Sequence, residues 1–311
     1  MKLLFFDEFR LGVLEGDTVH DVTAVVQDVP HTGPHDLVNA LVARFAERRA
    51  ALTDAVRRGK GVPLKQVRVR PPVPRPVTIV CMAVNYMEDG TRKEPAPINA
   101  FQKSPLCVIG DGDTMVLPDV PATIFEGEAE VAVVIGKRAK NVAAADAMSH
   151  IFGYVNFIDG SARGLPPPGN VFYQMKSRDT FAPIGPYIVT ADEIRDPHQL
   201  QVRLWVNGVL KQNFNTSDMA HKIPRCIEWV SSVHTLEPGD VLATGTNHRG
   251  LSSFQDGDVV ELESDGLGRL RFHVRDELKR TWGRETRLDM ANKGSKEITT
   301  PQLTGKYAAR S

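Results

Sequence analysis

The sequence has few cysteines, no excess of charge and no long apolar run. Its three cysteines, Cys81, Cys107 and Cys226, are far apart and form no Cys-x-x-Cys pair. This excludes a disulfide framework and favours a reducing compartment. Lys plus Arg equals Asp plus Glu at 38 each among 311 residues, so no basic field is available for nucleic acid or an anionic membrane. The apolar start is too short for a signal peptide, and no stretch would cross a bilayer. We therefore expect a cytoplasmic globular protein.

The order of segments predicts two domains and an arm. Prolines crowd the stretch from Pro71 to Pro76, which favours a stiff, extended connector and a domain boundary near residue 75. Residues 1–75 are expected to form a small N-terminal domain, with a hairpin turn at Glu15-Gly16-Asp17 and a helix over residues 36–59. Residues 76–283 form the larger domain. The polar stretch 284–311 lacks periodicity and is expected to be an arm or a poorly ordered tail.

Strand patterns dominate the larger domain. Apolar runs such as VTIVCMAV, EVAVVIG, HIFGYVNFID and LQVRLWVNG alternate with turn sequences such as EPGD and SDGLG. Helices are expected only over residues 141–151 and 223–233, the second with Pro224 in its first turn. The predicted fold class is therefore α+β, mainly β.

The stretch FEGEAEVAVVIGK, residues 125–137, places three glutamates at the start of a buried strand. Residues two apart in a strand point to the same face, so Glu128 and Glu130 project together, and Glu126 joins them if the strand begins early. Side-by-side like charges need solvent, basic partners or a divalent cation to neutralise them. Asp159 ends a second apolar run, and three carboxylates meeting there would suit Mg²⁺ or Mn²⁺.

Six blocks in a fixed order carry a family resemblance: EAEVAVVIGK, GYVNFIDGSARG, MKSRDTFAPIGPYIVT, LWVNGVLKQNFNTSDM, TLEPGDVLATGT and FQDGDVVELESDGLG. Together they resemble the fumarylacetoacetate hydrolase family from about residue 77 to residue 275. The resemblance implies a mixed β-roll with few helices, a small N-terminal domain and a homodimer. It also implies chemistry on small 2-oxo or 2,4-dioxo acids, such as acylpyruvates, at a Mg²⁺ or Mn²⁺ ion.

The resemblance also assigns site residues. The implied metal ligands are Glu128, Glu130 and Asp159. Lys176 matches the lysine that faces the substrate, where its charge would stabilise an enolate oxygen. The implied substrate-binding residues are Tyr86, Arg163, Gly245 and Thr246, of which Arg163 is also a candidate partner of the acids. Gln174, or its neighbour Tyr173, is a further substrate-binding candidate, because it follows a loop with three prolines, Pro166 to Pro168, that departs from the family and would reshape the pocket.

The segment VNYMEDGTRKEP departs from the family. Members that hydrolyse or decarboxylate usually carry Asn-Tyr-x-x-His-x-x-Glu here, and the His–Glu pair activates the attacking water. In this chain Asp89 stands at the histidine position and Arg92 at the glutamate position. An aspartate is a weak base unless it is buried, because its ordinary pKa lies near 4.

Other groups are open as the base. Asp89 itself, Glu88 or Glu94 could substitute, and His248, just after the Thr-Gly-Thr turn, is a candidate from another loop. We take Lys176, Asp89 and His248 as the catalytic candidates. Hydrolysis of a C–C bond in a 2,4-dioxo acid is the preferred function. The alternatives are a decarboxylase, a tautomerase or a hydratase at the same metal site, and a binding protein without chemistry.

Overall fold

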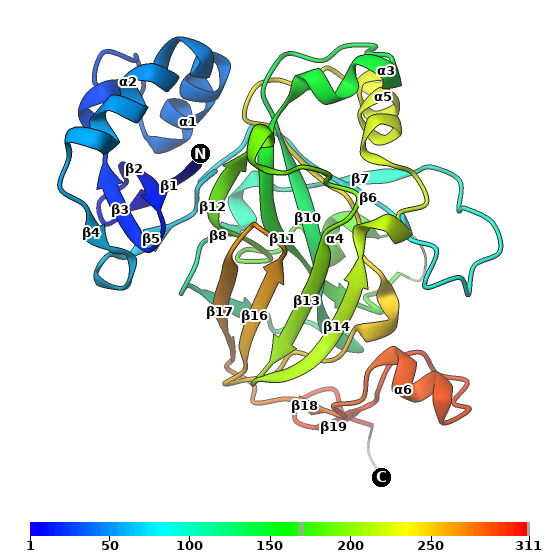
Figure 1. The fold of residues 1–311 in the computed structure, drawn as a ribbon. Coiled ribbons are helices and arrows are strands. Elements are labelled where there is room, and N and C mark those ends of the chain that lie inside the picture. The colour runs from blue at the N-terminus through cyan, green and yellow to red at the C-terminus, as the bar shows by residue number, and fades with distance from the viewer. Residues whose placement is uncertain (168, 170, 310–311) are drawn as a thin grey trace.

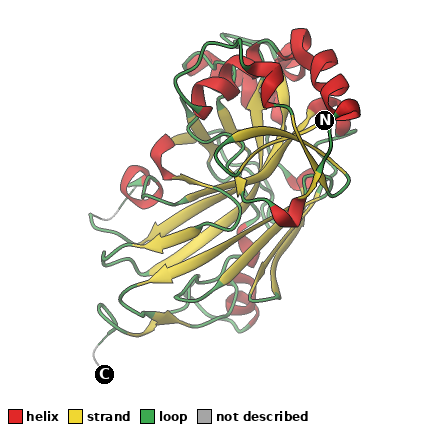
Figure 2. Ribbon diagram, turned by 90° about the vertical axis from the view of Figure 1, so that its left-hand side faces the viewer, coloured by secondary structure: helices red, strands yellow, loops and turns green. Residues whose placement is uncertain are grey.

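The computed structural model describes residues 1–167, 169 and 171–309. About 35% of the chain is strand and 23% helix. Strands run through the centre of the molecule, and helices gather mainly at the end where the N-terminus lies (Figure 2). The expected mainly β, α+β fold is confirmed.

The larger sheet holds the longest strands at its middle. Both β10 (Ile124–Ile135) and β11 (Ile151–Arg163) are buried along nearly their whole length, which explains their continuous apolar sequences. In order across the sheet, the strands are β4 (Val62–Pro63), β3 (Thr18–Asp21), β2 (Arg10–Glu15), β1 (Lys2–Phe6), β12 (Ala182–Thr190), β11, β10, β15 (Val241–Ala243), β6 (Ile79–Met82) and β7 (Ala100–Lys103), with β5 (Val69–Arg70) on β1 and β8 (Val108–Ile109) on β12.

The smaller sheet packs one face against the larger sheet. Its strands are, in order, β14 (Val209–Asn215), β13 (Gln201–Val206), β16 (Val259–Ser264), β17 (Arg269–Asp276) and β9 (Thr114–Leu117). Burial alternates along β13 and β16, as expected for a strand with one face in the core. Asn156 of β11 joins the sheets, because its amide bonds the backbone of Ser264 and of Gly268.

The N-terminal segment contributes strands to the same large sheet. β1 pairs with β12 through Lys2–Val189 and Leu3–Ile188, and the expected hairpin turn lies between β2 and β3, where Gly16 has a φ of +56°. The single helix expected over residues 36–59 is wrong. It divides into α1 (Pro34–Ala43) and α2 (Phe45–Arg58) at Arg44, whose φ of −118° and ψ of 18° leave the helical region. Each helix buries apolar residues, Leu37, Val38, Leu41 and Val42 in α1 and Leu52 and Val56 in α2.

The remaining helices are short. They are α3 (Ala144–Ala147), α4 (Phe172–Lys176), α5 (Ile223–Val233) and α6 (Arg287–Asn292). The helix expected over residues 141–151 is therefore limited to α3 and a 3-10 turn, whereas the one over residues 223–233 is confirmed as α5. The C-terminal arm carries α6, with a Thr286–Asp289 capping box, and β19 (Gln302–Thr304), which pairs with β18 (Thr281–Trp282) just before the arm (Figure 1).

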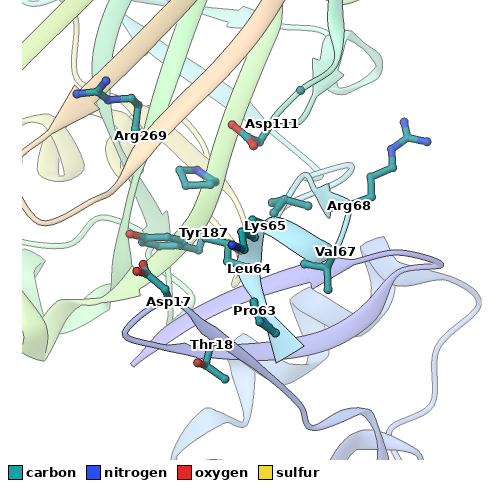
Figure 3. A pocket seen from close by; sticks show the side chains of 13 residues that line it. Asp17, Thr18, Pro63, Leu64, Lys65, Val67, Arg68, Asp111, Tyr187 and Arg269 are labelled. Carbon is teal, nitrogen blue, oxygen red and sulfur yellow. The ribbon is translucent and has the colours of Figure 1, made fainter. Parts of the chain in front are cut away.

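A pocket of about 960 Å³ lies between the N-terminal strands and the larger domain (Figure 3). Asp17, Leu64 and Arg68 line one side, and Tyr187 and Arg269 line the other. The predicted metal ligands are not among its lining residues. Within the described part of the chain, we find no helix with the length and apolarity that crossing a bilayer requires.

Candidate active site

Strand register brings the predicted metal ligands together. β10 and β11 are antiparallel, and Glu128 lies directly opposite Asp159. Opposite residues share a face, and Glu130 projects to that face because it is two residues along β10. Ligand oxygens of Glu128, Glu130 and Asp159 lie within 4.8 Å of one another, and all three side chains are buried. These residues could hold a metal ion.

Lys176 lies among these acids. Its ammonium nitrogen is 2.5 Å from Glu128 Oε1 and 2.5 Å from Asp159 Oδ2, and its side chain is 2% exposed. The lysine is the last residue of α4, and that short helix is positioned by Phe172, whose ring stacks on Phe101 of β7 at 4.6 Å. The predicted site lysine is therefore a buried part of the acidic cluster and not a surface residue.

A second buried lysine was not predicted. Lys103, the last residue of β7, places its ammonium nitrogen 2.7 Å from Asp159 Oδ1 and 3.2 Å from the Gly160 carbonyl oxygen. Burial by itself would lower the pKa of Lys103, but the Asp159 carboxylate, together with Cys107 and Cys81, outweighs burial and raises the pKa. Its only sequence signal is its place at the end of a short strand, which many surface lysines share.

Glu126 anchors arginines from two segments. Arg163, which ends β11, donates from Nε to Glu126 Oε2 at 3.0 Å and from Nη2 to Glu128. Arg287, the first residue of α6, donates to the same Glu126 oxygen at 2.6 Å. Arg163 is thus an ion-pair partner of the acids, and its role toward a substrate stays a prediction. The part of Arg287, from the polar arm, was not predicted.

The two neighbouring glutamates have opposite pKa shifts. Burial disfavours the charge of Glu128, but Lys176 and then Arg163 outweigh burial and hold its pKa well below the usual range. The pKa of Glu130 is raised well above that range, first by burial and then by the charges of Asp159 and Glu128. Without a bound cation, the surroundings of Glu130 therefore favour its neutral form, whereas those of Glu128 favour its charged form.

The Thr-Gly-Thr turn after β15 is bound to β10. The Gly245 amide donates to Glu130 Oε2 at 2.6 Å, from a backbone with a φ of +87° that favours glycine. The hydroxyls of Thr244 and Thr246 donate to the carbonyls of Val131 and Ala129. Gly245 therefore orients a predicted metal ligand, while the Thr246 hydroxyl proton is already used within the protein.

Three other predicted residues lie outside the acidic cluster. Tyr86 is fully buried, with its ring against Phe214 at 5.1 Å. Gln174 donates to the Pro166 carbonyl in the proline loop, of which Pro168 is outside the described residues. The Asp89 side chain is 50% exposed and contacts Arg249 at 3.5 Å. Their roles toward a substrate or a water stay predictions.

His248 and Glu88 lie next to the cluster and contact each other. His248 Nδ1 is 2.6 Å from Glu88 Oε1, and the His248 amide donates to Glu88 Oε2 at 2.9 Å. His248 Nε2 is 4.0 Å from Glu128 Oε2. The structure thus joins a residue after the Thr-Gly-Thr turn to the altered segment near residue 88.

The arrangement can support enolate chemistry on a small acid. Buried carboxylates offer hard oxygen ligands for a divalent cation. Lys176 adds a positive charge beside them, and an imidazole faces them from one side. A carbonyl compound held there would meet a cation, a fixed ammonium and a base in one protected site.

Comparison with known proteins agrees with this geometry. Residues 78–275 match the family described as "Fumarylacetoacetate (FAA) hydrolase C-terminal". The maleylpyruvate hydrolase of Aquipseudomonas alcaligenes is 33% identical over 295 residues, which span 88% of this chain and 99% of that protein. A Bos taurus protein named oxaloacetate tautomerase FAHD2B, mitochondrial, is 35% identical over 271 residues, which span 81% of this chain and 82% of that protein.

The fold of a solved relative is also similar. The crystal structure of maleylpyruvate hydrolase from Sphingobium sp. SYK-6, in complex with manganese(II) ion and pyruvate, aligns with a TM-score of 0.80 and 37% identity. The alignment covers 89% of this chain and 99% of that one. The sequence match, these relatives and the shared fold place the chain in the fumarylacetoacetate hydrolase family.

Proposed function

We propose that this chain is a divalent-metal-dependent hydrolase that cleaves a C–C bond of a 2,4-dioxo acid of the acylpyruvate class. The observation that carries the proposal is the buried group of Glu128, Glu130 and Asp159 with the Lys176 ammonium between two of them. The relatives named maleylpyruvate hydrolase support the substrate class, because maleylpyruvate is a pyruvate that carries an acyl group.

The residues present fit a hard divalent cation such as Mg²⁺ or Mn²⁺. All the candidate ligands are carboxylate oxygens, which these ions prefer. The pKa of Glu130 is raised first by burial and then by its acidic neighbours, so a cation bound here would stabilise the charged form of this carboxylate. When bound, the ion would supply a Lewis acid that polarises the 2-oxo group.

The charge balance of the cluster favours an enolate. Within the described residues, the acids Glu126, Glu128, Glu130 and Asp159 are matched by the cations Lys103, Lys176, Arg163 and Arg287. A divalent ion would add positive charge, of which Glu88 beside the cluster offsets only a part. The remaining positive charge attracts a developing enolate oxygen more strongly than a neutral ketone oxygen, so it would stabilise the enolate relative to the starting ketone.

Tautomerisation of a 2-oxo acid is the second candidate. It needs the same ion and the same enolate but no attacking water. The His–Glu pair that activates water in the family is replaced here by Asp89 and Arg92. The relative named oxaloacetate tautomerase supports it. Decarboxylation and hydration would use the same metal site and the same enolate.

We also propose that the protein is a homodimer, by resemblance to the family. Light scattering on the purified protein would measure its oligomeric state.

Proton NMR would test the proposal directly. Purified protein with Mg²⁺ would be given acetylpyruvate or maleylpyruvate, and a matched sample would contain EDTA. We expect pyruvate and the second acid, acetate or maleate, to appear only with Mg²⁺. Enol–keto exchange without cleavage would favour the tautomerase, and products that form equally in EDTA would contradict a metal-dependent site.

A further inference from the structure

We infer that Glu88 and His248 form the carboxylate–imidazole pair that activates water in this chain, in place of a pair carried by the 89–92 segment. The inference rests on the proposed function and names the residues that would perform its proton transfer. His248 would be the catalytic base, and Glu88 its positioning residue.

The backbone turns Glu88 inward and Asp89 outward. Glu88 and Asp89 have φ values of +56° and +53°, and Gly90 continues the left-handed turn at +79°. Non-glycine residues rarely adopt this conformation, and such backbone is concentrated at functional sites. As a result the Glu88 side chain is 8% exposed, whereas that of Asp89 is 50% exposed.

Glu88 fixes the orientation of the His248 ring. An ionised carboxylate only accepts hydrogen bonds, so the 2.6 Å contact from Glu88 Oε1 to His248 Nδ1 requires the proton on Nδ1. The second oxygen accepts from the His248 amide at 2.9 Å, which holds the ring and its own backbone together. In the neutral ring the lone pair is then on Nε2, which faces the predicted metal ligand Glu128.

Nε2 is at a suitable place to take a proton. It is 4.0 Å from Glu128 Oε2, which is too far for a direct hydrogen bond, and a carboxylate oxygen offers no proton to its lone pair. The ring is 22% exposed and belongs to the loop that begins with the Thr-Gly-Thr turn. A water beside the ligand cluster could be reached by Nε2 from this position.

The proton transfer balances as follows. His248 Nε2 removes one proton from water, and the water oxygen forms a bond to the acyl carbonyl carbon while the π electrons of that carbonyl move onto its oxygen. The carbonyl then re-forms as the bond between that carbon and C3 of the pyruvate unit breaks, and the electron pair of the broken bond remains on the pyruvate unit as an enolate. The imidazolium returns the proton to C3. The net reaction converts an acylpyruvate and water into a carboxylic acid and pyruvate.

Single substitutions would distinguish a loss of proton transfer by the Glu88–His248 pair from a loss of metal binding. For His248→Asn we expect kcat for acetylpyruvate cleavage to fall by about 100- to 10,000-fold, with Mn²⁺ affinity, measured by electron paramagnetic resonance, unchanged within about threefold. For Glu88→Gln we expect a smaller loss of kcat with little change in KM. The double variant should be no slower than His248→Asn alone, because the two residues act as one unit.

A spectroscopic readout accompanies the kinetics. In wild type the His248 Nδ1 proton should give a downfield ¹H resonance, and this signal should be lost in Glu88→Gln. His234→Asn serves as the matched control, since His234 Nδ1 contacts the neighbouring Thr235 carbonyl in the loop after α5. Circular dichroism and melting temperature would verify that each variant is folded.

Two results would overturn the inference. One is a kcat for His248→Asn within threefold of wild type, and the other is a loss confined to Asp89→Asn. A wild type that binds Mn²⁺ but cleaves neither substrate would instead reject the proposed hydrolase. In that case, exchange of the pyruvate methyl protons with deuterium would still test whether His248 is the base, because this exchange needs a base but no attacking water. Exchange that survives in His248→Asn would then reject His248 as the base.

Discussion

Glu128 and Glu130 are two residues apart on one strand, but their carboxyl groups have different surroundings. Lys176 and Arg163 hold the first in its charged form, whereas burial and acidic neighbours favour the neutral form of the second. Glu130 is therefore the ligand at which an added cation would relieve the most repulsion. Gly245 directs this carboxylate by a single amide hydrogen bond.

For Glu130→Gln we expect Mn²⁺ affinity to fall by at least about 100-fold, since loss of an outer-shell partner alone costs 10- to 100-fold. The fold should be kept, with an equal or higher melting temperature in the metal-free protein, because a buried like charge is removed. Titration of free Mn²⁺ by electron paramagnetic resonance would measure the affinity. Glu237→Gln, in an exposed pair with Arg138, is the control. Unchanged Mn²⁺ affinity would rule out the three-acid site.

The raised pKa of Glu130 predicts how metal binding depends on pH. Below that raised pKa the carboxyl holds a proton that the ion must displace, so Mn²⁺ affinity should increase as the pH rises through the window above the usual Glu pKa of about 4.3. Calorimetry in two buffers of different ionisation enthalpy would count the released proton. Proton release that persists undiminished in Glu130→Gln would assign it to another group.

At the scale of elements, the arm and the central strands are joined through one buried carboxylate. Glu126 on β10 accepts from Arg163 on β11 and from Arg287 on α6, and it is 1% exposed. The Thr286–Asp289 capping box begins α6 at the position that directs Arg287 inward. The polar arm is thus attached beside the acids of the site.

For Arg287→Ala we expect a loss of about 1–3 kcal/mol in the free energy of unfolding. Removing one partner of a buried ion pair typically costs about 3–5 kcal/mol, but Arg163 remains to compensate Glu126. Urea denaturation would measure the loss. A double-mutant cycle with Glu126→Gln should show coupling between the two residues, and strict additivity would argue against the contact.

The sequence predicts which strands form and which acids belong to the site, but it does not predict how the strands pair to bring those acids together. Period-two spacing places Glu128 and Glu130 on one face, and long apolar runs mark β10 and β11. The pairing of Glu128 with Asp159, however, depends on a strand register that no local pattern encodes. The predicted ligand set relied on the family resemblance for this reason.

Other features could not be predicted because they depend on contacts far apart in the sequence. Lys103 resembles any strand-end lysine until β7 is packed against α4. Arg is a good helix former, so the break at Arg44 is not visible in helix propensity. The choice between Glu88 and Asp89 depends on left-handed backbone at both residues, which non-glycine residues seldom adopt.

At the scale of the whole molecule, one sheet crosses the predicted domain boundary. β1 pairs with β12, so the N-terminal strands extend the sheet that contains the site. The Arg49–Asp192 ion pair adds a contact from α2 to the larger domain. These contacts favour cooperative unfolding of the two parts.

We therefore expect a single unfolding transition. The three tryptophans, Trp205, Trp229 and Trp282, all lie in the larger domain, whereas α1 and α2 supply much of the helix signal of the N-terminal segment. Tryptophan fluorescence and far-ultraviolet circular dichroism should give the same midpoint in guanidinium. Loss of the helix signal before the fluorescence change would show that residues 1–75 unfold independently.

The contact between Glu88 and His248 joins two loops that are 160 positions apart in the chain. If this pair carries the proton transfer, selection would act on both positions jointly, and substitutions at them should occur together during evolution. Homologues with an acid at the first position should carry a histidine at the second, and those with the usual His–Glu pair should be free to vary at both. A column-by-column motif search would classify this chain as a degenerate enzyme, although its base would have moved to another loop.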